Sequence, residues 1–210
     1  MSVLKGMVIS MARVKICGLS RSCDIYAVNT VKPDYIGFVF ADSRRKVTPA
    51  QAANLRKILS PIIVPVGVFV NEPPGNILSI VREGSIDIIQ LHGSEDEKYI
   101  QGLKMRTDKP IVKAITVQNK GDVQKWSDTA ADYLLLDHKG GGTGEKFDWG
   151  LIGKSEKPYF LAGGLNPESV ADAMQKTAPF AVDVSSGVET DGFKDLEKMR
   201  EFVRRARDEH

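Results

Sequence analysis

The sequence predicts an α/β protein, a single-domain (β/α)8 TIM barrel, from its length and from the rhythm of its apolar runs. Its 210 residues are enough for one sizeable core and stand near the small end of the size range of such barrels. Eight short runs rich in Val and Ile alternate with amphipathic segments of roughly helical length, as in repeated βα units around a parallel sheet. An open doubly wound sheet is the alternative, but its glycine fingerprint belongs at the first βα turn, and here the glycines gather after the late strands.

The predicted strands are short and apolar, and several of the helices between them have clear start signals. The strands are expected at residues 13–17, 35–40, 63–70, 86–91, 110–115, 132–137, 158–162 and 180–185. Thr48 before Pro49 places a cap residue ahead of a proline at the first helical position, and Asn166 before Pro167 repeats the pattern. A further helix is expected to use Ser94 as its cap, with acidic residues in its first turn.

Composition and charge exclude several classes of protein. A hydrophobic fraction of 42% with 27% charged residues is ordinary for a globular protein. The formal net charge of +2 gives no support for nucleic-acid binding. The apolar run at 61–70 contains two prolines and falls well short of the ~18 residues of a membrane span, so it is interpreted as a buried strand. We therefore expect no nucleic-acid or membrane partner, and we favour a monomer.

The chain is divided here into an N-terminal extension, residues 1–10, and one barrel domain, residues 11–210. The opening segment has an interrupted apolar stretch and no small-residue cleavage site, and Met11 is a possible second start. With two cysteines and no secretory signal, the expected compartment is the reducing cytoplasm, where a disulfide is unusual. No linker or repeat beyond the βα rhythm supports a second domain.

Polar residues stand at the carboxyl ends of the predicted strands, which is the end where barrels of this kind build their active sites. Cys17 ends the first strand, Gln90 and His92 flank the end of the fourth, Asp137 ends the sixth, and residues 183–186 end the eighth. Position alone leaves Asp137 open as either a general acid or a turn residue. In the same way, His92 is either a ligand contact or a helix cap.

The two cysteines are expected to differ. Cys17 at a strand end points toward the site, where a nearby cation or helix terminus would favour its thiolate. Cys23 lies in a predicted helix and is interpreted as structural. The two are too far apart for a C-x2-C metal pair, and neither H-E-x-x-H nor G-x-S-x-G occurs, so no metal site or serine hydrolase is predicted.

Three glycine clusters follow the late strands, at residues 141–144, 162–164 and 185–187. Glycines allow backbone N–H groups to approach an anion closely, and barrels often bind phosphate after strands seven and eight. The alternative is that they serve only tight turns. Three consecutive cations at 44–46 are either a solvated surface or the source of an arginine that binds an anionic substrate in a bidentate manner.

Several longer motifs occur in one order along nearly the whole chain from Lys15. They are KICGL (15–19), GFVF (37–40), SRRKVTP (43–49), QLHG (90–93), LLLD (134–137), GGTGEKFDW (141–149), LAGGL (161–165) and DVSSGVE (183–189). In these motifs the sequence closely resembles the phosphoribosylanthranilate isomerase family of tryptophan biosynthesis.

The resemblance implies a barrel that converts N-(5-phosphoribosyl)anthranilate to 1-(2-carboxyphenylamino)-1-deoxyribulose 5-phosphate by an Amadori rearrangement, without cofactor or metal. It implies Cys17 as the general base and Asp137 as the general acid. It places Arg45 against the anthranilate carboxylate, and His92 and Asp183 near the substrate. The residues that it implies for phosphate binding are Gly142, Thr143, Gly144, Gly163, Gly164, Ser185, Ser186 and Gly187.

The chemistry explains why an acid and a base are both needed. The acid protonates the ribose ring oxygen so that the ring opens to a protonated Schiff base, and the base then removes the C2 proton to give an enolamine. A rival interpretation is another sugar-phosphate barrel. Indole-glycerol-phosphate synthase normally needs a lysine acid and base, and a histidine-pathway isomerase an aspartate where this chain has Cys17. A non-catalytic phosphate sensor is disfavoured because both Cys17 and Asp137 are present.

Overall fold

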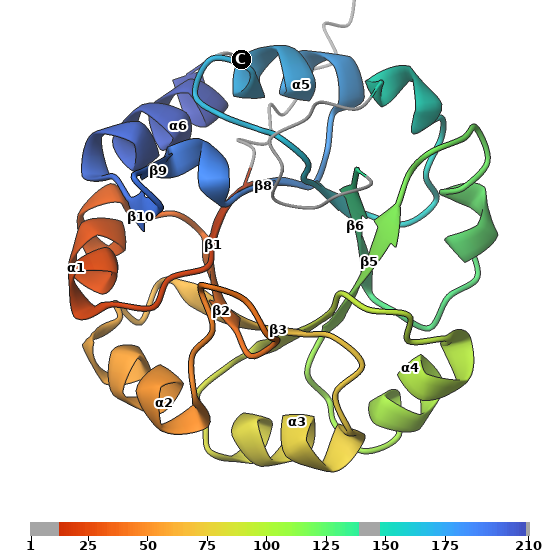
Figure 1. Ribbon diagram of the computed structural model, residues 1–210. Helices are drawn as coiled ribbons and strands as arrows, with labels where there is room; N and C mark the ends of the chain where they lie inside the picture. The colour runs from red at the N-terminus through yellow and green to blue at the C-terminus, as the bar shows by residue number, and fades with distance from the viewer. Residues whose placement is uncertain (1–12, 139–147, 209–210) are drawn as a thin grey trace, which may run out of the picture.

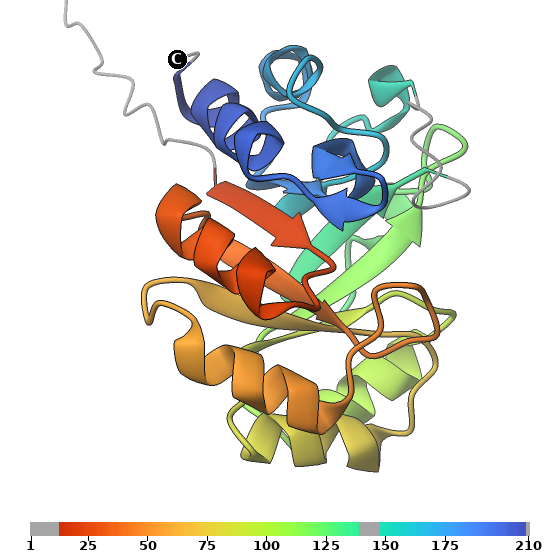
Figure 2. The same cartoon turned by 60° about the vertical axis from the view of Figure 1, so that its left-hand side comes forward.

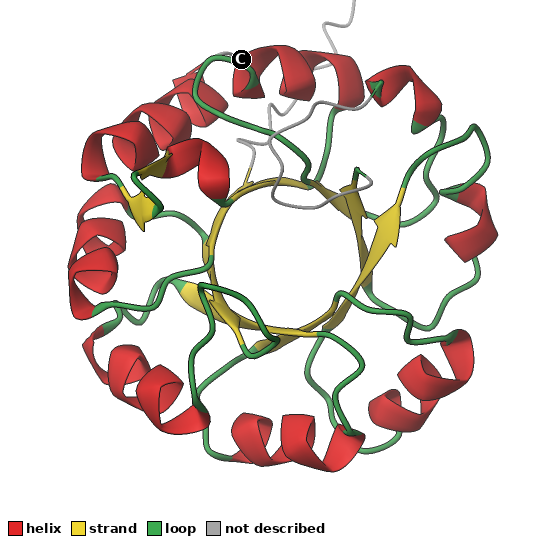
Figure 3. Cartoon of the chain, viewed as in Figure 1, coloured by secondary structure: helices red, strands yellow, loops and turns green. Residues whose placement is uncertain are grey.

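The structure, a computed structural model, describes residues 13–138 and 148–208. Eight parallel strands form a closed barrel in sequence order, with the helices on its outside (Figures 1 and 3). The strands are β1 Arg13–Cys17, β2 Tyr35–Val39, β3 Val64–Phe69, β4 Ile88–Leu91, β5 Ile111–Thr116, β6 Tyr133–Asp137, β7 Tyr159–Leu161 and β8 Ala181–Val184. The pairing of β8 with β1 closes the barrel. The predicted fold and all eight predicted strands are confirmed, whereas the expected extension at 1–10 lies outside the described residues.

The helices surround the barrel, and α1 and α6 pack against each other over the join between β1 and β8 (Figures 1 and 2). The α-helices are α1 Ser22–Val31, α2 Pro49–Ile58, α3 Pro74–Arg82, α4 Glu97–Lys104, α5 Val170–Thr177 and α6 Leu196–Asp208. Three short 3₁₀ turns, η1 Gln124–Trp126, η2 Trp149–Leu151 and η3 Ser186–Val188, and a small hairpin, β9 Glu189–Thr190 with β10 Phe193–Lys194, complete the described elements.

The βα rhythm predicted a helix after every strand. Among the described residues, the connection from β6 to β7 has only the 3₁₀ turn η2, and the connection from β5 to β6 has only the 3₁₀ turn η1. Its sequence, VQNKGDVQKWSD, is rich in residues that favour turns over helix interiors, with Gly121 at a φ of 95°. No cap residue followed by a sustained apolar face is available there, so the chain returns to the start of β6 along the outside of the barrel without an α-helix (Figure 1).

The predicted helix starts are confirmed at one place and wrong at another. Thr48 caps α2, with its Oγ1 accepting from the backbone of Gln51 at 3.2 Å and the Gln51 side chain binding back at 2.8 Å. Ser94 is not the cap of α4, because Asp96 accepts from the Tyr99 N–H at 2.8 Å and begins the helix two residues later. A carboxylate at this position is the stronger cap, since it also interacts favourably with the helix dipole.

The Asn166 cap stands one turn ahead of its helix. Its Oδ1 accepts from the Ser169 N–H at 2.9 Å, but the residues between them form a turn and α5 begins only at Val170.

The core has two layers because both faces of each strand are buried. Outward side chains such as Ile16 and Ile36 pack under the helices, while inward ones such as Val66, Val112 and Phe160 fill the barrel. The inward positions become polar toward the carboxyl ends of the strands, and this places the candidate site. Over the described ranges, no helix is long and apolar enough to cross a membrane.

Candidate active site

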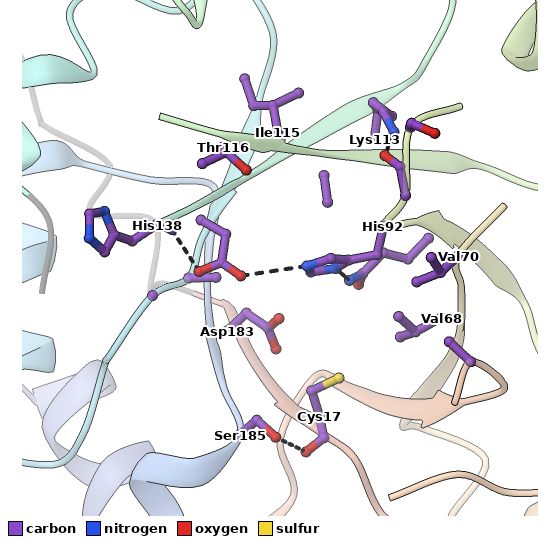
Figure 4. Close-up of a pocket in the computed structure, with 18 of the residues that line it drawn as sticks. Cys17, Val68, Val70, His92, Lys113, Ile115, Thr116, His138, Asp183 and Ser185 are labelled. Atoms are coloured by element: carbon purple, nitrogen blue, oxygen red, sulfur yellow. Dashed lines mark hydrogen bonds and ion pairs between the residues drawn. The ribbon is translucent and has the colours of Figure 1, made fainter. Parts of the chain in front are cut away.

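A cavity of about 1220 Å³ opens at the carboxyl ends of the barrel strands (Figure 4). Most of the described residues that the sequence predicted for the site line it: Cys17, Arg45, His92, Asp137, Gly163, Gly164, Asp183, Ser185 and Ser186. Gly187 is not among the lining residues. Gly142, Thr143 and Gly144 lie outside the described residues. The cavity therefore collects both predicted catalytic residues and, apart from Gly187, the described residues of the predicted phosphate loops.

Cys17 ends β1 with its thiol directed into the cavity (Figure 4). Its neighbour across the sheet is Gly37 on β2, where a Cβ would stand 2.5 Å from the sulfur. Gly37 therefore provides the space that the thiol occupies. The next residue, Gly18, has a φ of 83°, and a Cβ there would stand 2.3 Å from the Arg45 side chain. The two glycines let the β1 end approach both β2 and the loop that carries Arg45.

A buried ion pair lies one inward position below the thiol. Lys15 Nζ contacts the two carboxylate oxygens of Asp183 on β8 at 3.0 and 3.1 Å, and the Lys15 side chain is 1% exposed. Burial alone would lower the pKa of Lys15, but the Asp183 carboxylate outweighs it and the net shift is upward. The lysine is therefore a fixed cation inside the barrel.

The same surroundings act on the thiol in opposite directions. Burial raises the pKa of Cys17, the positive charge of Lys15 lowers it, and the net shift is upward. In the free protein the thiol is therefore protonated at neutral pH. In the view of Figure 4, Asp183 lies between Cys17 and His92. His92 is on the side of the cavity opposite to Cys17.

Asp137 ends β6 and is held from two sides. Its Oδ1 accepts from the His138 backbone N–H at 2.8 Å, and its Oδ2 lies 3.5 Å from Nε2 of His92. The other ring nitrogen of His92, Nδ1, lies 2.8 Å from the side-chain nitrogen of Gln90. The His92 ring contacts Gln90 and Asp137, and α4 is capped by Asp96, so the interpretation that His92 caps the next helix is wrong.

Arg45 stands at the rim of the cavity and is paired with a residue that the sequence did not single out. Its Nε and one terminal nitrogen donate to the two oxygens of Glu189 at 2.7 and 2.8 Å. Arg44 and Lys194 bind the same carboxylate at 2.6 and 2.7 Å. Burial would raise the pKa of Glu189, but hydrogen bonds from Arg45 and Lys194 outweigh it, so the net shift is downward. Three cations around one buried carboxylate leave this rim positively charged.

The loops after β7 and β8 approach each other closely. A Cβ on Gly187 would stand 1.9 Å from the carbonyl oxygen of Leu165, so only glycine fits there. Ser185 is engaged within the protein, since its hydroxyl donates to the Cys17 carbonyl at 3.0 Å and lies 3.3 Å from Lys194 Nζ. Gly163 and Gly164, with φ of 84° and 67°, line the cavity with their backbone.

Sequence reasoning missed Lys15, Glu189 and Lys194 as functional residues. Lys15 had a usable signal, because a lysine inside a predicted buried strand needs a buried partner. Glu189 and Lys194 had none, because the arginines that bind Glu189 lie 144 and 145 positions away in the chain and Lys194 is placed by its contact with Glu189.

Both cysteines are free, and the outcome for Cys23 differs from that for Cys17. Cys23 lies in α1, as predicted, but it is exposed, so the structure gives no support for the structural role expected of it. In the part of the chain that the structure describes, no group of three or more His, Cys, Asp or Glu side chains is arranged to hold a metal ion.

The cavity lies at the carboxyl ends of eight parallel strands and has a thiol and a carboxylate on its walls. This fold and this position of the site are those of (β/α)8-barrel enzymes. Residues 14–205 match the family model of N-(5'-phosphoribosyl)anthranilate (PRA) isomerase. The chain belongs to this family.

Individual relatives agree with the family match. The chain is 47% identical over 198 residues to N-(5'-phosphoribosyl)anthranilate isomerase of Endomicrobium trichonymphae, a match that covers 92% of this chain and 98% of the relative. The crystal structure of phosphoribosyl anthranilate isomerase from Thermotoga maritima is 36% identical, with a TM-score of 0.85, and covers 94% and 100% of the two chains. A phosphoribosyl anthranilate isomerase in complex with reduced 1-(o-carboxyphenylamino)-1-deoxyribulose 5-phosphate is 35% identical, with a TM-score of 0.82 and the same coverage.

Proposed function

We propose that this protein isomerises N-(5-phosphoribosyl)anthranilate to 1-(2-carboxyphenylamino)-1-deoxyribulose 5-phosphate in tryptophan biosynthesis. The observation that carries the proposal is that Cys17 and Asp137 line one cavity from β1 and β6, strands on different sides of the barrel mouth (Figure 1). The family membership and the relative bound to a reduced form of the product support it.

In the first step Asp137 acts as the general acid. It gives its proton to the ribose ring oxygen, the bond from that oxygen to C1 breaks, and the electrons of the substrate nitrogen form a protonated Schiff base. The His138 N–H on Oδ1 stabilises the carboxylate that results. The substrate's own iminium is the electron sink for the next step, so the proposal needs neither a cofactor nor a metal.

In the second step Cys17 acts as the general base. Its thiolate removes the C2 proton, and the C–H electrons move toward the iminium to give an enolamine, which tautomerises to the ketone. The thiol must first lose its own proton, against its raised pKa. Two positive charges favour that loss: the fixed ammonium of Lys15 and the iminium that the first step brings into the cavity.

The two anionic ends of the substrate have two candidate sites. The loops after β7 and β8, with Gly163, Gly164, Ser185 and Ser186, would bind the phosphate through their backbone, together with the predicted residues of 142–144. Gly187 would act indirectly, by allowing the two loops to meet. Arg45, held at the rim by Glu189, would bind the anthranilate carboxylate. Asp183 and His92 complete the wall that faces the sugar.

The direct test uses purified protein and freshly made phosphoribosylanthranilate, followed by the loss of anthranilate-type fluorescence. Saturable turnover is expected. No turnover, with the substrate shown to be intact, would contradict the proposal.

The proposal includes a monomer acting in the cytoplasm. Both cysteines are free thiols, which fits a reducing compartment. Sedimentation of the purified protein tests the monomer.

A further inference from the structure

We propose that Gln90 is a positioning residue that fixes the proton of His92 on Nε2, so that this N–H faces Asp137 and stabilises the carboxylate formed when Asp137 donates its proton. The catalytic part of this inference rests on the proposed function. The tautomer itself is a property of the free protein.

The first observation is the place of Gln90 in the barrel. It occupies an inward position of β4, is 1% exposed, and is paired in the sheet with Val68 on one side and Val112 on the other. Burying an amide among valines lowers the stability of the fold unless the amide makes hydrogen bonds. Its oxygen has no hydrogen-bond partner among the residues that the structure describes, so only its nitrogen is used.

The second observation is the direction of the contact. The Gln90 side-chain nitrogen lies 2.8 Å from Nδ1 of His92. In this orientation of the amide, the nitrogen donates and cannot accept, so Nδ1 is the bare, accepting nitrogen of the ring; the flipped amide would place Oε1 against a protonated Nδ1. A neutral imidazole then carries its proton on Nε2.

The third observation is what Nε2 faces. It lies 3.5 Å from Oδ2 of Asp137, longer than a hydrogen bond in the free protein, and contacts of this kind tighten when a substrate closes the site. The other oxygen, Oδ1, already accepts from the His138 N–H. An N–H on Nε2 therefore gives the second carboxylate oxygen its donor.

The chemical consequence concerns the first step of the reaction. As the O–H bond of Asp137 breaks and the proton moves to the ring oxygen, negative charge grows on the carboxylate, and the His92 N–H stabilises it without transferring a proton. If the proton were on Nδ1, the lone pair of Nε2 would face the growing charge and oppose the step.

The test reads the tautomer by nitrogen NMR of histidine-labelled free protein, with the His92 signals identified by their loss in His92→Asn. In the wild type, Nδ1 is expected to be bare and Nε2 protonated. Gln90→Glu places an acceptor where the donor was and is expected to draw a proton onto Nδ1. Where the buried carboxylate of that variant prevents folding, Gln90→Leu is measured instead, and the single tautomer is expected to become a mixture.

The kinetic readout separates positioning from packing. Gln90→Glu should lower kcat about fivefold to tenfold, the loss of one hydrogen bond, with little change in KM. Gln101→Glu, the same change on the exposed face of α4, is the control and should leave kcat unchanged.

A proton found on Nδ1 in the wild type, or an unchanged tautomer in the Gln90 variants, would overturn the proposal. Absence of turnover by the wild type would instead contradict the proposed isomerase function and leave the tautomer result standing.

Discussion

The two sides of the cavity that carry the proposed chemistry are built differently. On the side of β1 and β8, Cys17 is nearly buried and stands above an ion pair of Lys15 and Asp183 that is closed to solvent. On the side of β4 and β6, Asp137 meets the ring of His92, which is 33% exposed, and a backbone N–H. One side has a buried ion pair, and the other has a histidine ring and a backbone donor.

The difference follows from what each group must do. A thiol is a weak base in its neutral form, so the base side needs a positive charge that is not weakened by solvent. An acid must exist with its proton and give it up, so the acid side needs donors that stabilise the carboxylate without holding it permanently charged. Strand ends of the same kind therefore acquire opposite roles from their neighbours.

The largest expected effects are those of the two reacting groups. Cys17→Ser and Asp137→Asn should each lower kcat by about 100-fold or more, the scale of a lost general base or acid. Steady-state turnover of phosphoribosylanthranilate measures both.

Matched controls are available in the same chain. Cys23→Ser changes the exposed thiol of α1, and Asp132→Asn changes a carboxylate just before the opposite end of β6, where it binds Lys104 at 2.7 Å. Neither should change kcat, although Asp132→Asn should cost some stability. Near-normal turnover by Cys17→Ser would show that the base is another group.

On the side of β1 and β8, the stability of the protein should depend on the ion pair of Lys15 and Asp183. Lys15→Met leaves Asp183 buried without its cation, which is expected to lower the free energy of unfolding by about 3–5 kcal/mol. Urea unfolding measures it. The double variant Lys15→Met with Asp183→Leu should be more stable than Lys15→Met alone. If the single and the double variant were equally unstable, the unpaired Asp183 carboxylate would not be the cause of the instability of Lys15→Met.

The positively charged rim predicts a dependence on acid pH. The lowered pKa of Glu189 means that its stabilising contribution is complete above the ordinary value of 4.5 and is lost as the pH falls through the lowered value. Glu189→Gln should therefore be less stable than the wild type at neutral pH, by about 1.5–3 kcal/mol for a charged hydrogen bond. The gap should narrow at pH values below 4.5. Urea unfolding of both proteins across that pH range measures the difference in stability. A difference that does not change with pH would contradict the pairing of Glu189 with the cations of the rim.

The smallest expected effect is a shift in the reactivity of the thiol. In the Cys23→Ser variant Cys17 is the remaining cysteine, and its alkylation by iodoacetamide reports the thiolate. Because the pKa of Cys17 is raised, the midpoint of the rate against pH should lie above the ordinary value of 9.0. A midpoint below that value would show that Lys15 outweighs burial in the free protein.

The fold and the positions of the reacting groups were predictable because they depend on local pattern. Each strand is a short apolar run, and Cys17 and Asp137 are the polar residues that end two of them. The ion pair was not predictable in the same way, because Lys15 and Asp183 are 168 positions apart and meet only when β8 closes on β1.

Two other contacts of the site could not be predicted from the sequence, for different reasons. Arg45 and Glu189 are 144 positions apart, so their pairing depends on the loops after β2 and β8 meeting at the rim. Gln90 and His92 are close in sequence, but β4 ends between them at Leu91, and the side-chain alternation of a strand no longer predicts where His92 points.

The division of the two steps between Asp137 and Cys17 is tested most directly with substrate that carries deuterium at C2. In Cys17→Ser, removal of the C2 proton should limit the rate, so the deuterated substrate should turn over more slowly than the ordinary one. In Asp137→Asn, ring opening should limit the rate, and the two substrates should turn over equally. The reverse pattern, with the isotope slowing Asp137→Asn and not Cys17→Ser, would contradict the assignment of acid and base.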